Sequence, residues 1–288
     1  YEYVDTKNAL SLVYDDKENN TKTTLAYNEV KMESMDVLYP SGDLVRSSAS
    51  MNYEASNLYF DSQKQWDLGK GDNLIAGVTA KHETYNQLYS DSVDNSRNSY
   101  AIYASYNKNF NDKFSTTLGL RGQYYASTDY DNSYDEILPQ LQTVYKLTEN
   151  TSWYTNIGKA FELPAINAHE YYAAGAQAKN SVEPQSGWNY ETGLKKITDT
   201  TATKFAVYHM DFKNKFAWEL VPEIDPVNKV QVNKGKFRNS GVELEYKKIL
   251  NNKWSYNLGA AYQNPESYDE DKDVWNQESA RVTLNAGV

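Results

Sequence analysis

The residues with the most obvious capacity for ligand chemistry lie in one long connecting segment, residues 163–183. Within it His169 is followed closely by Tyr171 and Tyr172. An imidazole can ligate a metal ion, and phenol rings can stack on a planar ligand or hydrogen-bond to it. The same three side chains could instead pack within the loop and bind nothing. Their spacing alone leaves both interpretations open.

Two acidic groups are further candidates for a binding site. One lies within residues 129–136 and the other within residues 269–273. Carboxylates at alternate positions can bind calcium, but neither group has the glycine and terminal glutamate of a calcium loop. We therefore interpret both as solvated loop charge and expect no metal site. The chain also lacks a G-x-S-x-G element and a phosphate-binding loop, so we do not expect an enzyme.

The composition removes further classes of protein. The chain has 288 residues, no cysteine, and 39 acidic against 29 basic side chains, which gives a formal charge of -10. Without cysteine there is no disulfide framework and no thiol nucleophile. The negative charge argues against a nucleic-acid partner, because phosphates require a basic surface. No apolar run approaches the roughly 18 residues that a membrane-spanning helix needs.

The elements that must position any site follow a period of two. Residues 114–125, 254–263 and 280–288 alternate between an apolar and a polar set of side chains. Such alternation predicts strands with one apolar and one polar surface, and no segment keeps the period of a long helix. The fold class predicted is therefore all-β.

Turn residues divide the chain into about 13 strands. We place them at about 7–15, 21–33, 46–66, 73–89, 98–110, 113–128, 137–147, 151–162, 184–198, 201–219, 228–248, 253–264 and 277–288. Short and long connections alternate along the chain, and aromatic residues collect near both strand ends. This pattern is typical of a transmembrane antiparallel β-barrel, with tight turns at one end and long loops at the other.

Three segments, in order, resemble the barrel of TonB-dependent outer-membrane receptors. They are residues 138–164, which end in KAFELP, residues 181–195, SVEPQSGWNYETGLK, and residues 230–246, VQVNKGKFRNSGVELEY. We assign structural roles to the motif residues: Pro164 would stop strand pairing, Gly241 would allow close backbone approach, and Glu243 would face the lumen. The other motif residues are Lys159, Phe161, Pro184, Glu191, Gly193 and Gly235.

The resemblance implies a domain that is only part of a barrel. We expect residues 1–288 to supply about 13 strands of a barrel of about 22, incomplete at both ends and without the plug domain. It also implies a bacterial outer-membrane location, no covalent chemistry and no resident cofactor. The expected partners are outer-membrane lipid and lipopolysaccharide and, through the plug, the TonB complex, with the receptor itself a monomer.

The expected function is import of a ferric siderophore, energised through TonB, with His169, Tyr171 and Tyr172 contacting the ligand. Three alternatives stay open. A haem importer would use His169 as an iron ligand. A passive porin or surface barrel would share the strand pattern without TonB coupling, and a soluble all-β interaction module would share only the alternation.

Overall fold

The structure is a computed structural model that describes residues 3–34, 37–38, 44–45, 52–88, 94–127, 133–166, 182–222, 229–270 and 272–288. All the regular secondary structure in these ranges is strand. No helix within them is long and apolar enough to cross a membrane.

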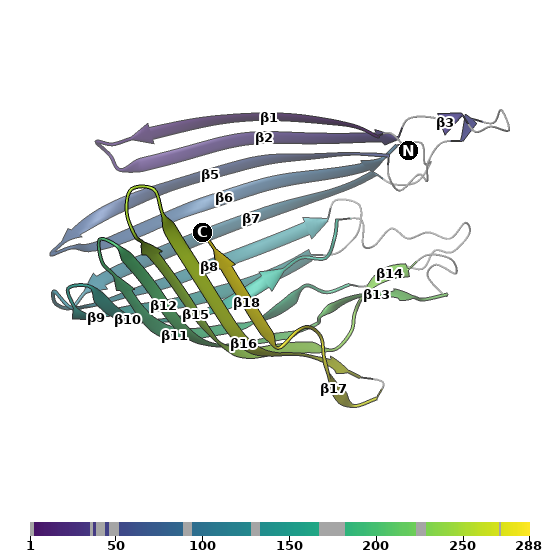
Figure 1. The fold of residues 1–288 in the computed structure, drawn as a ribbon. Helices are drawn as coiled ribbons and strands as arrows, with labels where there is room; N and C mark the ends of the chain where they lie inside the picture. Colours follow the sequence, from purple (N-terminus) through teal and green to yellow (C-terminus); the bar gives the residue numbers. More distant parts are fainter. Residues whose placement is uncertain are drawn as a thin grey trace.

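Within the described ranges, 14 strands form one sheet by antiparallel pairing between neighbours (Figure 1). They are β1 (Tyr3–Asp16), β2 (Thr21–Ser34), β5 (Tyr53–Gly69), β6 (Asp72–Gln87), β7 (Asp94–Asn109), β8 (Phe114–Ser127), β9 (Ser133–Thr148), β10 (Thr151–Glu162), β11 (Gln185–Ile197), β12 (Thr201–Lys213), β15 (Lys236–Ile249), β16 (Ser255–Asp269), β17 (Val274–Gln277) and β18 (Val282–Gly287). Two small hairpins lie outside this sheet: β3 (Val37–Leu38) with β4 (Leu44–Val45), and β13 (Phe216–Leu220) with β14 (Lys229–Asn233).

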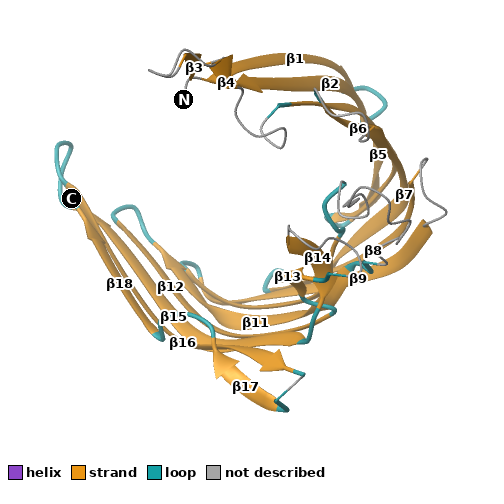
Figure 2. Ribbon diagram, turned by 90° about the vertical axis from the view of Figure 1, so that its right-hand side faces the viewer, coloured by secondary structure: helices purple, strands orange, loops and turns teal. Residues whose placement is uncertain are grey.

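The large sheet curves into an open arc (Figure 2). In the described part of the chain β1 pairs only with β2, while β17 and β18 both pair with β16 at the opposite edge. The prediction of an all-β, antiparallel barrel wall is confirmed, and the wall is not closed.

The two faces of the sheet differ as the alternation requires. On β7, Tyr100 and Ile102 are 51% and 68% exposed, whereas their neighbours Ser99 and Ala101 are buried. The buried set lies on the concave side, because Leu163 covers it and the adjoining segment is hydrogen-bonded to the β13–β14 hairpin, which lies inside the arc (Figure 2). The exposed apolar set therefore forms the convex surface, as in a barrel whose outer face meets hydrocarbon.

Tight turns close one end of the sheet with a shared hydrogen-bonding pattern. The side-chain oxygen of Asn111 accepts the amides of Lys113 and Phe114, both at 2.9 Å. Asn251 accepts the amides of Lys253 and Trp254 in the same way, at 2.9 and 3.1 Å. An asparagine side chain can replace a backbone acceptor in this manner, so the short connections predicted at these positions are fixed locally.

Two predicted strands are each broken in the structure. The segment predicted at 201–219 divides into β12 and β13 at Asn214, and that predicted at 228–248 divides into β14 and β15 at Gly235. Both break residues have positive φ, 56° and 78°, which ends the extended ladder. A Cβ on Gly235 would lie 2.2 Å from the Tyr268 carbonyl oxygen, so only glycine fits. The β13–β14 hairpin is free to leave the sheet as a result.

The prediction of one long connection at residues 265–276 is wrong. Strand β16 continues through Pro265, which lies opposite Asn239 of β15, and ends at Asp269. The proline carbonyl accepts the amide of Glu278, so the edge remains hydrogen-bonded on that side. The strand predicted at 277–288 correspondingly begins at Val282.

Candidate ligand-facing wall

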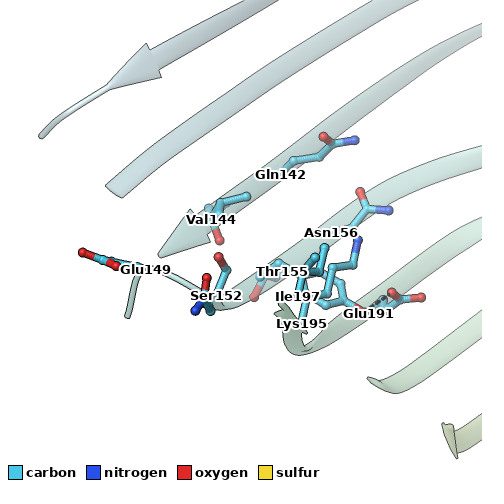
Figure 3. Close-up of a pocket in the computed structure, with 12 residues that line it drawn as sticks. Gln142, Val144, Glu149, Ser152, Thr155, Asn156, Glu191, Lys195 and Ile197 are labelled. Carbon is cyan, nitrogen blue, oxygen red and sulfur yellow. Dashed lines mark hydrogen bonds between the residues drawn. The ribbon is translucent and has the colours of Figure 1, made fainter. Parts of the chain in front are cut away.

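A polar network lies on the inner surface of β10, β11 and β12. The Tyr154 hydroxyl donates to Glu191 Oε1 at 2.6 Å, and Lys204 Nζ lies 3.4 Å from the same carboxylate oxygen. Lys195 Nζ lies 4.8 Å from the centroid of the Tyr154 ring. Beside this network lies an open cavity of about 450 Å³. Figure 3 shows residues that line it, among them Asn156, Glu191 and Lys195. The network presents both charge signs and an aromatic face to the lumen.

Glycines on neighbouring strands make room for these aromatic rings. A Cβ on Gly193 would lie 2.9 Å from the Tyr154 ring, and one on Gly241 would lie 2.6 Å from the Tyr208 hydroxyl. A Cβ on Gly241 would also lie 2.8 Å from the Tyr262 carbonyl oxygen, a backbone atom of the neighbouring strand. Glu243 and Lys204 line a second inner cavity of about 570 Å³.

A second polar network covers β5, β6 and β7. Arg97 Nη2 lies 3.1 Å from Glu83 Oε2, and Lys81 Nζ lies 2.7 Å from Glu83 Oε1. The Tyr103 hydroxyl donates to Asp61 Oδ2 at 3.1 Å. Sequence reasoning missed these residues, although Lys81 and Glu83 stand two positions apart and so share one strand face, a spacing that could have indicated an ion pair.

Arg97 also ties the segment after β10 to the inner wall. Its Nη1 donates to the Pro164 carbonyl at 3.0 Å, and the next amide, that of Ala165, donates to Gln231 of β14 at 3.0 Å. Strand β10 ends at Glu162, two residues before Pro164, which has no N–H to donate to a ladder.

The segment before β11 is held in a similar way. The Tyr134 hydroxyl donates to the Val182 carbonyl at 2.8 Å. The Glu183 amide donates to Asn233 Oδ1 at 2.6 Å, and Asn233 Nδ2 returns a bond to the Glu183 carbonyl at 2.7 Å. Asn214 reaches the Pro184 carbonyl at 3.5 Å. The hairpin and the wall thus hold both ends of the long segment.

Two other motif residues connect the end of β10 to β9 and β8 through their side chains. Lys159 forms an ion pair with Glu136 of β9, and the Phe161 ring stacks on Tyr125 of β8 with centroids 5.3 Å apart. The β9–β10 ladder stops beside Pro139, which has no N–H to donate, so these side-chain contacts take over where backbone pairing ends.

The sequence-predicted ligand residues His169, Tyr171 and Tyr172 lie outside the described residues, and so do Asp129, Asp131 and Asp271. The described histidines, His82 and His209, bond to Asn98 and Ser240 at 2.8 Å. Among the described residues no three His, Cys, Asp or Glu side chains gather to hold a metal ion.

Comparison with known sequences and structures agrees with this architecture. The sequence profile described as "TonB dependent receptor-like, beta-barrel" matches residues 1–288. The chain belongs to this family. Its convex apolar surface therefore lies in the bacterial outer membrane. A search of curated proteins found no match.

Solved structures share the fold of this TonB-dependent receptor-like barrel at low sequence identity. The FrpB iron transporter from Neisseria meningitidis (F3-3 variant) aligns with a TM-score of 0.73 and 15% identity over 94% of this chain and 45% of that chain. The siderophore receptor PirA from Pseudomonas aeruginosa aligns with 0.70 and 17% over 92% and 49%. The pyoverdine receptor FpvA from Pseudomonas aeruginosa PAO1 aligns with 0.70 and 16% over 96% and 46%. The chain spans about half the length of these structures.

Proposed function

We propose that this barrel wall serves active import of a ferric siderophore across the outer membrane, energised through TonB. The observation that carries the proposal is the inner wall itself. Tyrosines alternate there with cations and carboxylates, as in the contacts among Tyr154, Glu191 and Lys195. Such a wall can bind a large polar ligand weakly at many points, which suits passage better than permanent retention.

The long-loop end supports capture of a ligand in preference to free diffusion. The ends of the segment around His169 are bonded to the wall and to the β13–β14 hairpin, for example through Arg97 and Asn233. These contacts place the two ends of the segment on the concave side of the sheet. In an unobstructed pore that space would be open. A passive porin is therefore the less favoured function.

Deletion of the gene in iron-starved cells tests the proposal. Uptake of radioactive iron supplied as siderophore complexes should fall, and it should fall equally when TonB is removed. A strain that lacks the gene for an unrelated outer-membrane protein is the control. Uptake that is unchanged by the gene deletion would show that the protein does not import these complexes, and uptake that survives loss of TonB would favour a passive channel.

The proposed function also implies partners. The TonB complex would act through a plug domain, and outer-membrane lipid with lipopolysaccharide would cover the convex surface. We propose a monomer as the working unit. Cross-linking in intact cells would test this, because a crosslinked species of twice the monomer mass would contradict it.

A further inference from the structure

A hollow lies on the inner wall across β5 to β8, distinct from the cavity shown in Figure 3. Its volume is about 160 Å³. Ser99 and Ala101 form its floor at consecutive inward positions of β7, and they are 4% and 9% exposed. In the cross-strand register Ser99 lies between Lys81 of β6 and Tyr125 of β8. Two small side chains flanked by large ones leave the space open.

The lining of this hollow carries more positive than negative charge. Lys81, Arg97 and Arg121 face one carboxylate, Glu83, so three positive charges meet one negative charge. This is a local surplus of two in a chain whose net charge is -10. Both Lys81 and Arg97 are bonded to Glu83. In the described part of the chain Arg121 has no ion pair: its guanidinium lies 5.6 Å from the centroid of the Tyr103 ring, and its Nε donates to Gln123 at 2.8 Å. Its terminal N–H groups remain available.

A second, independent observation points to a ligand. The Ser99 hydroxyl is buried and has no hydrogen-bond partner among the described residues. A buried hydroxyl without a partner is costly, and such groups in folded proteins usually bond to something. A ligand oxygen in the hollow would satisfy it. Tyr59, Tyr125 and Leu163 also line the hollow and give it aromatic and apolar surface, so the space suits a group with a flat apolar body.

We propose that this hollow binds the carboxylate of a small aromatic or otherwise planar ligand. The guanidinium of Arg121 can donate two parallel hydrogen bonds to a carboxylate, and Ser99 can donate a third. Lys81 adds positive charge beside them. The inference rests on the proposed import function only in that import would bring such a ligand to the barrel. Binding to the purified protein and uptake by cells are measured separately, so failure of the pocket and failure of the import function are distinguishable.

Calorimetric titration of the detergent-purified protein, produced from its complete gene, tests the pocket. The probe is benzoate and the matched control is benzamide, which has the same shape without the charge. Benzoate should bind at least about tenfold more tightly, because a charge-assisted bidentate contact is stronger than a neutral one. Equal affinity for the two probes, or no binding of benzoate, would overturn the proposal.

Variants locate the binding within the protein. Arg121→Gln should weaken benzoate binding about tenfold, and Arg121→Lys should weaken it less because the charge remains without the planar fork. Ser99→Ala should weaken it by a smaller factor. Arg238→Gln is the matched control, since this arginine pairs with Glu266 on other strands. Circular dichroism checks that each variant keeps its strand content. Unchanged affinity in Arg121→Gln would assign binding elsewhere and contradict the pocket.

Discussion

The ring of Tyr154 lies against the backbone of Gly193, its cross-strand partner on β11. The side chain missing at Gly193 leaves the space that the ring occupies. From there the Tyr154 hydroxyl reaches Glu191 at 2.6 Å. The motif residue Gly193 therefore determines the position of the Tyr154 hydroxyl, which is bonded to a second motif residue, Glu191.

Substitution of Gly193 by alanine should destabilise the barrel wall. The added Cβ would lie 2.2 Å from the Phe205 carbonyl oxygen, a backbone atom that can move only with its strand. We expect a loss of about 1–3 kcal/mol in the free energy of unfolding, measured by urea titration in detergent micelles. Gly122→Ala is the control, because its Cβ would contact only Ile102 at an ordinary 3.8 Å. Equal stability of the two variants would contradict the explanation.

Removal of the Arg97 side chain should loosen the segment after β10. Its contacts with Glu83 and the Pro164 carbonyl are largely shielded, with side-chain exposures of 16% and 19% for the ion pair. Arg97→Ala should cost about 1–3 kcal/mol and accelerate hydrogen exchange at the Ala165 amide. Lys17→Ala, which breaks an exposed pair at the opposite end, should change neither quantity measurably. Unchanged exchange at Ala165 would show that the anchor does not depend on Arg97.

Acidification should weaken the contact between Glu278 and the start of the β13–β14 hairpin. Burial alone would raise the pKa of the Glu278 carboxyl, but hydrogen bonds from Lys215 and Ser267 hold this pKa below its ordinary value of 4.5. The contact therefore stabilises the folded protein at pH values above 4.5, the ordinary pKa of the carboxyl. This stabilisation disappears as the pH falls through the lower pKa that Glu278 has in the folded protein. Thermal unfolding should show Glu278→Gln to be less stable than the unaltered protein at neutral pH, with the difference shrinking in acid. A difference that grew in acid would have the wrong sign.

His169 distinguishes a siderophore importer from a haem importer. Under the proposed function we expect the purified protein to leave the Soret band of added haem unshifted, and His169→Ala to make no difference. The control is titration with a ferric siderophore. Its binding is measured as quenching of the protein's tryptophan fluorescence. A Soret shift that disappears in His169→Ala would instead establish haem as the ligand.

The sequence predicted the wall better than its interruptions. The alternation of apolar and polar side chains around Leu118 and Leu120 depends only on which face of the strand meets lipid. It can therefore be recognised in the sequence of a single strand. The break at Asn214 was missed because asparagine enters the left-handed region without changing the polarity pattern. Pro265 gave the opposite error: proline commonly ends pairing, yet here its strand continues.

The candidate site was harder to predict for a different reason. The hollow beside Arg121 exists because Ser99 and Ala101 are small while residues on three other strands are large. Strand register, which a single sequence does not specify across long connections, decides which of these side chains become neighbours. The motif residues Lys159 and Phe161 were recognised as important, but their contacts with Glu136 and Tyr125 likewise depend on register.

The short turns at Asn111 and Asn251 determine more than the pairing of their strands. In each turn a lysine is followed directly by an aromatic residue, Phe114 or Trp254, whose carbonyl accepts a closing backbone bond. The ammonium group requires water or headgroup oxygen, and the ring favours the boundary just beneath it. Two adjacent residues with different depth preferences fix the level at which the sheet rests in the bilayer. Insertion of one residue into such a turn should therefore alter the vertical placement of the wall even if every strand remains paired.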